Sequence, residues 1–380
     1  MWLIQLYPFI YTHFCSENIL LYNIQTKKYY ILPSYDEIQI INRFSLILLD
    51  KYGDKSQLSL TVKKETLGTV QKVDTLSQYV LPNFDIRLAE YLDWFTKADW
   101  DNKFIKERYI NKLVINLTNE FDVFTGEIKA EGKEIMKAEL LHSLWEKKSE
   151  FKNLIQVSIN TNYHALKENY STISLMVDFY ETTLNIPLND FVNNVKDYLS
   201  IKCKIIILIM YLNDNILKII KDVIEKYNVQ VCIFLNSIND YNLLAHNNLL
   251  MHSNIIININ SESSSPDFDN LLSYSIEDTF VHNPTFEKIL QKEYFNLLYW
   301  GNAYINYVGD VYINRNIPIG NITTWNDIDF CRFLDSNSLW KLIRKNFLPC
   351  NKCCFQNVCP PITIFEDITN RSYCLHRIIT

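Results

Sequence analysis

Short apolar runs separated by polar turns characterise the start of the chain. Residues 18–22 and 28–32 are rich in β-branched and aromatic side chains and are joined by a polar stretch, so they predict a β-hairpin. Ser34 and Glu37 then have the spacing of a helix capping box. The apolar residues that follow recur at helical intervals, at Ile38, Ile41, Phe44, Ile47 and Leu48. We therefore expect a helix behind the hairpin.

From residue 109 onward, strand-like apolar runs alternate with amphipathic patterns of helical period. The runs expected to be strands are 112–117, 154–159, 174–180, 204–211, 229–235 and 254–259. The segments expected to be helices are 133–148, 188–199 and 216–227. Alternation of this kind predicts βα units and an α/β fold, built as a parallel sheet or a partial barrel.

Changes in composition divide the chain into three expected units. The polar stretch 50–81 adds short elements to the first unit, which ends near Pro82 and therefore spans residues 1–82. The βα alternation occupies residues 83–283 and ends after a Ser-rich loop at 261–266. Residues 284–380 are aromatic, Asn-rich and finally Cys-rich. A chain of 380 residues is long enough for several packed units.

Composition and charge exclude several classes of function. Only 7 residues are glycine and none forms a Gly-x-Gly pair, so a dinucleotide-binding turn is absent. Gly126 and Gly132-Lys133 do not match a P-loop, because five residues separate the glycines and Glu134 follows the lysine. A net charge of -6 gives no footprint for nucleic acid or an anionic membrane. The longest apolar run is short and no secretory signal opens the chain, so we expect a cytoplasmic protein.

The main chemical signal is the distribution of the cysteines. In a reducing compartment the nine cysteines are not expected to form a disulfide framework, and Cys15 belongs to the scattered ones. Cys350, Cys353 and Cys359 crowd the end of the chain together with Cys374. Four thiolates suit either tetrahedral zinc or an iron-sulfur cluster, and unligated thiols are the simpler alternative. The adjacent Cys354 is expected to be a spare thiol.

The residues before and around these cysteines resemble a SPASM domain, the extension of radical-SAM peptide-modifying enzymes that carries auxiliary [4Fe-4S] clusters. The matching positions are Trp300-Gly301-Asn302, Gly309-Asp310-Val311-Tyr312, Asn314, Pro318-Ile319-Gly320-Asn321, Ser338-Leu339-Trp340, Arg344 and the Cys350-x2-Cys353-x5-Cys359-Pro360 motif. The resemblance favours iron-sulfur over zinc. This chain lacks the upstream cysteine pair and has Thr363 where a further cysteine stands in the family, which implies one cluster instead of two.

The middle unit departs from the radical-SAM pattern that usually accompanies a SPASM domain. The family places Cys-x3-Cys-x2-Cys after its first barrel strand, but residues 120–127 contain no cysteine. The second strand ends at residues 159–162 without the family's Gly-Gly-Glu. The chain therefore resembles the pseudo-radical-SAM/SPASM proteins of Bacteroidales-type ribosomal peptide (RiPP) modification systems. That resemblance implies a degenerate partial (β/α)6 barrel with no catalytic residues and no S-adenosylmethionine.

The expected hairpin and helix also resemble the PqqD-like element that recognises precursor peptides by adding them as a strand to a sheet edge. The resemblance assigns peptide contacts to Leu20, Leu21, Tyr22, Tyr29 and Tyr30. A hairpin that only caps the barrel is the alternative.

The resulting hypothesis is a non-catalytic scaffold whose partners are a precursor peptide and an active radical-SAM enzyme. An iron-sulfur electron-transfer or redox subunit, and a zinc-stapled binding module, are the two rival hypotheses.

Overall fold

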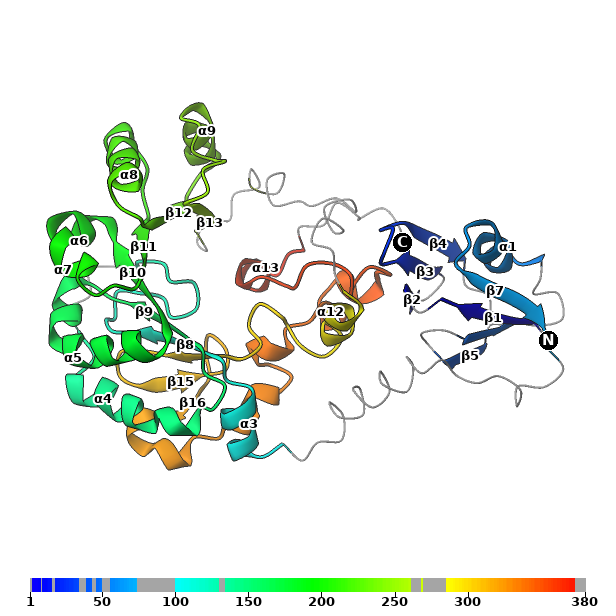
Figure 1. Ribbon diagram of the computed structural model, residues 1–380, viewed down its shortest axis with the longest axis horizontal. Coiled ribbons are helices and arrows are strands. Elements are labelled where there is room, and N and C mark those ends of the chain that lie inside the picture. Colours follow the sequence, from blue (N-terminus) through cyan, green and yellow to red (C-terminus); the bar gives the residue numbers. More distant parts are fainter. Residues whose placement is uncertain are drawn as a thin grey trace.

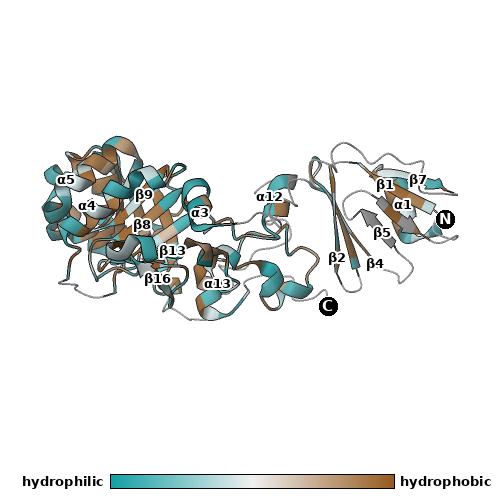
Figure 2. Cartoon of the chain, turned by 90° about the horizontal axis from the view of Figure 1, so that it is seen from below, coloured by the Kyte–Doolittle hydropathy of each residue, from teal (hydrophilic) through white to brown (hydrophobic). Residues whose placement is uncertain are grey.

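The computed structural model shows a mixed α/β chain with one large, mostly parallel sheet (Figure 1). The structure describes residues 2–7, 9–15, 18–33, 39–42, 46–49, 55–73, 100–129, 134–260, 268 and 285–372. Both expected unit boundaries, near residues 82 and 283, lie outside these ranges. In Figures 1 and 2 the N-terminal strands lie at one end, the large sheet lies at the other, and α12 (Phe286–Gln291) and α13 (Ile364–Thr369) lie between them. No helix in the described ranges is long and apolar enough to span a membrane.

The N-terminal unit contains two small antiparallel sheets. Its elements are β1 (Trp2–Leu6), β2 (Ile10–Cys15), β3 (Asn18–Asn23), β4 (Tyr29–Pro33), β5 (Gln39–Asn42), β6 (Leu46–Leu49), α1 (Gln57–Lys64) and β7 (Gly68–Lys72). One sheet has the order β5-β6-β1-β7 and the other the order β2-β3-β4. The predicted hairpin is confirmed as β3 and β4, which pair Leu21 with Tyr30. Short elements after residue 50 are confirmed as α1 and β7.

The predicted helix over residues 38–48 is wrong, because the described part of this segment forms strands β5 and β6. Ile40 pairs with Ile47, and β6 also pairs with β1 on its other side. The isoleucines that suggested a helical stripe are β-branched, and such side chains fit a pleated strand better than a helix. Pairing with β1 then supplies tertiary contacts that helical spacing could not anticipate. The capping-box residues Ser34 and Glu37 lie outside the described residues.

The large sheet has the order β13-β12-β11-β10-β9-β8-β14-β15-β16. Its first six strands along the chain are β8 (Lys112–Asn116), β9 (Gln156–Asn160), β10 (Glu181–Pro187), β11 (Lys204–Ile209), β12 (Gln230–Leu235) and β13 (Ile255–Ile259), and neighbouring members of this set are parallel. The helices around them are α3 (Asn102–Arg108), α4 (Ala138–Glu146), α5 (Tyr163–Phe179), α6 (Leu188–Asn193), α7 (Val195–Leu199), α8 (Asp214–Lys226) and α9 (Ile238–His246), with the 3-10 helix η3 (Lys147–Glu150). The predicted βα alternation is confirmed.

One strand of that alternation was predicted in the wrong place. Residues 174–179 belong to α5, and the third strand is β10, which begins at Glu181. The helix starts at Asn162, whose Oδ1 accepts a hydrogen bond from the Ala165 amide at 2.9 Å. Once this cap has begun the helix, it continues through the apolar run at Ser174–Val177 because Ile173 and Met176 bury one face of it.

The C-terminal segment first extends the sheet and then leaves it. Its elements are α12 (Phe286–Gln291), β14 (Asn302–Ile305), β15 (Asp310–Tyr312), β16 (Pro318–Asn321), η5 (Ile322–Asp327), η6 (Phe330–Leu334), η7 (Leu339–Lys341), η8 (Arg344–Asn346), η9 (Cys350–Lys352) and α13 (Ile364–Thr369). Strand β14 pairs in parallel with β8, and Trp340 is buried in the same core as Ile115 and Ile159. Residues 302–340 are therefore part of the same packed body as the βα units.

Candidate functional site

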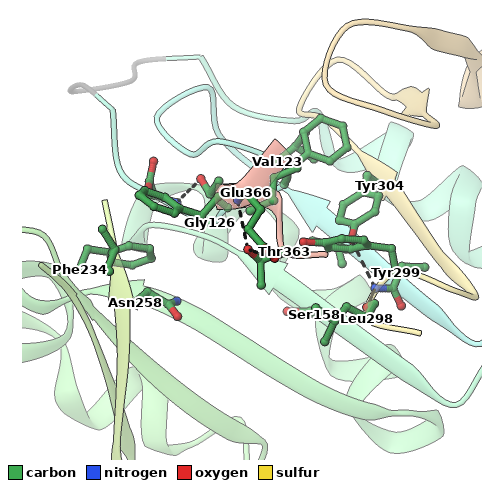
Figure 3. Close-up of a pocket in the computed structure, with 18 of the residues that line it drawn as sticks. Val123, Gly126, Ser158, Phe234, Asn258, Leu298, Tyr299, Tyr304, Thr363 and Glu366 are labelled. Atoms are coloured by element: carbon green, nitrogen blue, oxygen red, sulfur yellow. Dashed lines mark hydrogen bonds between the residues drawn. The ribbon is translucent and has the colours of Figure 1, made fainter. Parts of the chain in front are cut away.

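A cavity of about 850 Å³ lies over the face of the large sheet that the helices do not cover. Alternate residues such as Ile159 and Ile186 pack towards the helices, so their neighbours Ser158 and Asn185 face the cavity. Figure 3 shows Tyr299 and Tyr304 on one side, Phe234 and Asn258 on the other, and Thr363 and Glu366 between them above Ser158. The cavity therefore has walls from two distant parts of the sequence.

Three asparagines form a hydrogen-bonded row across the carboxyl ends of β8, β9 and β10. Asn116, Asn160 and Asn185 are in register on neighbouring strands. Asn160 Nδ2 donates to Asn116 Oδ1 at 2.6 Å, and Asn185 Nδ2 donates to Asn160 Oδ1 at 2.7 Å. Asn116 Nδ2 completes the row by donating to the carbonyl oxygen of Phe121 at 2.8 Å. These amides satisfy one another, which lowers the cost of burying them.

The loop after the first parallel strand, residues 117–129, folds over these strand ends; we call it the mouth loop. Isolated bridges pair Thr118 with Ile135 and Phe121 with Ile128. Phe121 is 5% exposed and packs in a cluster with Leu208, Cys232 and Phe234 on β11 and β12. Phe121 therefore covers the part of the strand ends at β11 and β12, whereas residues 123–127 of the same loop line the 850 Å³ cavity.

An ion pair holds the tip of the mouth loop. Asp122 Oδ2 lies 2.8 Å from Lys129 Nζ, and Asp122 Oδ1 accepts the amides of Phe124 and Thr125 at 2.9 Å. Burial favours the neutral carboxyl group, but the hydrogen bond from Lys129 and those from the backbone amides outweigh it and lower the pKa of Asp122. The loop is therefore a formed structure with its own internal contacts.

The opposite wall of the cavity depends on a buried ion pair. Arg344 and Glu366 have side chains that are 3% and 4% exposed, and Arg344 Nη2 lies 3.2 Å from Glu366 Oε2. Glu366 also completes a capping box with Thr363 at the start of α13, and Arg344 Nε donates to the carbonyl oxygen of Pro360. Removing one partner of such a pair leaves an uncompensated charge, so this pair fixes the position of residues 360–366.

The predicted thiol ligands lie beside these residues and have cationic neighbours. Arg344 Nη1 donates to Cys350 Sγ at 3.3 Å, and Ser372 Oγ lies 3.4 Å from the same sulfur. Lys292 Nζ donates to the carbonyl oxygen of Cys359 at 2.8 Å. Burial lowers the pKa of Lys292 to about 8, while the neighbouring Cys359 acts in the opposite direction. Arg344 and Lys292 therefore hold the backbone and side chains of the segment that carries these thiols.

The cysteines that the structure describes do not by themselves form the predicted four-thiolate centre. Cys350 packs with Phe347 and Ile362, whereas Cys353 and Cys359 belong to a different cluster. Within the described ranges no three His, Cys, Asp or Glu side chains are gathered closely enough to hold a metal ion. Cys374, the predicted fourth ligand, lies outside those ranges. Among the described residues, the set of thiol ligands is therefore incomplete.

The N-terminal unit packs directly on the cysteine segment, residues 350–359. Tyr11, Leu20 and Tyr22 are fully buried in a cluster with Phe355 and Val358. Asn357 Nδ2 donates to the Tyr11 hydroxyl at 3.0 Å. Tyr29 contacts the Phe355 ring edge-on at 5.4 Å. Residues from the two ends of the sequence therefore share one core.

A disulfide joins the same two parts and contradicts the expectation that cysteines would stay unpaired. Cys15 on β2 is bonded to Cys354, 339 residues away in sequence. Cys354 was expected to be a spare thiol, and Cys15 an isolated one. Sequence spacing could not reveal this pair because only the packing of β2 on the cysteine segment brings the two residues together.

The residues predicted to contact a peptide divide into two groups. Leu20, Leu21 and Tyr22 lie on the central strand β3 and are 0% exposed, so their side chains are part of internal cores. Tyr29 and Tyr30 lie on the edge strand β4. The Tyr30 hydroxyl donates to Glu65 Oε2 at 2.8 Å, just after α1. Burial, followed by the contacts with Glu65, raises the pKa of Tyr30 to about 12.

Sequence reasoning missed Phe121 and the asparagine row. The available signal was an asparagine near the end of each of three consecutive strands. The sequence does not give the register of these strands, and the register is what places the three asparagines side by side.

No family model and no curated protein matches this sequence. Solved structures of SuiB from Streptococcus suis are similar in outline. SuiB bound to S-adenosylmethionine has 13% identity and a TM-score of 0.41, and the match covers 98% of each chain. SuiB bound to the precursor peptide SuiA has 12% identity and a TM-score of 0.40, over 97% of this chain and 98% of that one. At this level of similarity we transfer no activity or ligand from SuiB.

Proposed function

We propose that this chain is a non-catalytic, pseudo-radical-SAM/SPASM-type protein that binds a precursor peptide for a partner radical-SAM enzyme. The observation that carries the proposal is the mouth loop. It has no cysteine in residues 117–129, and it places Phe121 in an apolar cluster at the strand ends. In a partial (β/α)6 barrel of the radical-SAM kind, that place would be needed for the catalytic cluster and S-adenosylmethionine. The chemistry would then belong to the partner enzyme.

The peptide site that we propose is the free edge of β4. The Asn23 amide donates to Lys28 O (2.8 Å) on the side of β4, and the next amide, Ile24, donates to Phe9 O (3.0 Å) on the side of β2. These two bonds show which residues of β3 direct their backbone groups towards β4. Hydrogen-bonded and non-hydrogen-bonded residue pairs alternate along two antiparallel strands. The backbone groups of Tyr30 and Leu32 therefore face β3, whereas those of Ile31 face outward. Within the described ranges, β4 pairs only with β3. An extended peptide could therefore add to this edge by backbone hydrogen bonds.

We further propose that Cys350, Cys353, Cys359 and Cys374 hold one [4Fe-4S] cluster, with zinc as the alternative. When bound, the cluster would cross-link the end of the chain, and its redox activity is not needed for peptide binding. The cysteine segment supports β3 and β4 through Phe355, so a staple there would stabilise the proposed peptide edge. Iron, sulfide and zinc assays on anaerobically purified protein, beside Cys359→Ala, would identify the metal.

The test of the proposed function is a titration of the chain with a labelled precursor peptide, measured by fluorescence anisotropy. We expect micromolar binding to the intact chain and loss of binding in Ile31→Pro, which removes the outward N–H. Leu60→Ala is the matched control, because Leu60 lies on α1 in the same unit and its side chain is 55% exposed. Circular dichroism would establish that both variants are folded. If the Ile31→Pro variant folds and binds as tightly as the control, the edge is not the site.

A further inference from the structure

The large sheet has a second cavity at the opposite end, where the parallel strands begin. This cavity has a volume of about 550 Å³ and is lined by the first residues of β8, β9, β10 and β11. Three lysines line it: Lys112 on β8, Lys202 before β11, and Lys204 at its start. Lys112 and Ser158 also line the 850 Å³ cavity, so the two cavities meet at these residues.

These lysines differ from Lys106, Lys129 and Lys152 in having no acidic partner among the described residues. Lys106, Lys129 and Lys152 lie 2.6 to 2.8 Å from carboxylate oxygens of Glu150, Asp122 and Glu107. In the described part of the chain, Lys112, Lys202 and Lys204 form no ion pair. Burial, and then the positive charge of Lys204, lowers the pKa of Lys112. A charged lysine in this position gains by acquiring an anion.

The cavity contains one acidic side chain, and it does not neutralise the lysines. Glu181 is exposed at the start of β10, and its Oε2 accepts a hydrogen bond from Gln156 Nε2 at 3.2 Å. The remaining polar groups include hydroxyls. Ser158 Oγ accepts a hydrogen bond from Asn185 at 2.9 Å, which leaves its O–H able to donate into the cavity, and Thr183 is half-buried beside it.

We infer that this amino-terminal cavity binds a small molecule that carries a phosphoryl group. Three lysines against one glutamate favour a dianion, and lysine ammonium groups with hydroxyl donors suit phosphate oxygens. The volume exceeds that of a phosphate ion, so the rest of the molecule would extend past Lys112 and Ser158 towards the larger cavity. This site lies at the opposite end of the sheet from the mouth loop and is distinct from the β4 edge.

The probes are inorganic phosphate and pyrophosphate, titrated into the full chain by isothermal calorimetry at constant ionic strength. We expect saturable binding that Lys112→Met weakens by about tenfold or more, because a buried charge-assisted contact is lost. Lys204→Gln should weaken it by roughly threefold, since that side chain is more exposed. Glu181→Gln should strengthen binding by roughly threefold, because it removes a repelling charge without changing shape.

Lys218→Gln, on α8 and outside both cavities, is the matched control and should bind like the unchanged protein. Acetate, titrated in the same way, tests whether a carboxylate binds as tightly as phosphate. Absence of saturable phosphate binding would overturn the assignment, as would equal loss in Lys218→Gln and Lys112→Met. Acetate binding as tight as phosphate binding would overturn the phosphoryl class. If Lys112→Met does not fold, the other two variants still test the assignment. It requires weaker phosphate binding in Lys204→Gln and stronger phosphate binding in Glu181→Gln.

Discussion

The strand ends under the mouth loop and the free edge of β4 use their polar groups in opposite ways. At the strand ends, Asn116, Asn160 and Asn185 bond to one another and Phe121 fills the adjacent apolar wall. At β4, alternation leaves the Ile31 backbone facing away from β3. The amides of the asparagine row are already paired with one another, whereas an edge strand presents backbone groups to which another strand can pair. Under the proposed function, the peptide is therefore recognised at the edge of β4 and not over the strand ends of the large sheet.

The largest loss of stability is expected for Phe121→Ala, which removes the side chain packed at the strand ends. Removing a buried phenyl ring from between Leu208 and Phe234 should cost about 3 to 5 kcal/mol of unfolding free energy. Phe179→Ala is the control, because Phe179 is 66% exposed, and it should cost less than about 0.5 kcal/mol. Urea unfolding measures both, and peptide affinity should be unchanged. Equal costs in the two variants would mean that Phe121 does not close the mouth.

A smaller loss of stability is expected when the disulfide between β2 and the cysteine segment is removed. Cys354→Ser removes the bond to Cys15, and its loss should lower the stability of the N-terminal unit by roughly 2 to 4 kcal/mol under oxidising conditions. The free, half-buried Cys203 provides the control Cys203→Ser. Peptide mapping without reductant should find Cys15 and Cys354 in one linked fragment. Full alkylation of both thiols in that experiment would contradict the link.

The smallest effect should come from Tyr30→Phe, which removes the hydroxyl that bonds to Glu65. The lost hydrogen bond should cost about 0.5 to 1.5 kcal/mol. The pKa of Tyr30 is raised to about 12 in the folded chain, from an ordinary 10.0. The unfolded chain therefore loses this proton first, and stability should fall as pH rises from about 10 to 12. Tyr30→Phe should remove that part of the pH dependence, and an unchanged slope would assign it to other tyrosines.

Local pattern was sufficient for strands that are themselves short, continuous apolar runs. The runs that became β8, β11, β12 and β13 are apolar stretches bounded by polar residues, as buried parallel strands are. The pattern failed at residues 39–42 and 46–49, where the pairing of β5 with β6 and of β6 with β1 decided the structure. It also failed at Ser174, where a cap at Asn162 had already begun a helix.

Contacts between distant segments were beyond reach of the sequence. The Cys15–Cys354 bond and the row from Asn116 to Asn185 depend on which elements pack together and in which register. Residue types did not indicate that Arg344 bonds to Cys350. They could not show that Cys350 faces a different cluster from Cys353 and Cys359.

Amide hydrogen exchange with and without the precursor peptide tests the central claim most directly. The account predicts that the peptide slows exchange at Ile31, whose N–H faces outward from β4, and leaves residues 117–129 unchanged. Slowed exchange in the mouth loop, with no change along β4, would contradict it by placing the peptide over the strand ends of the large sheet.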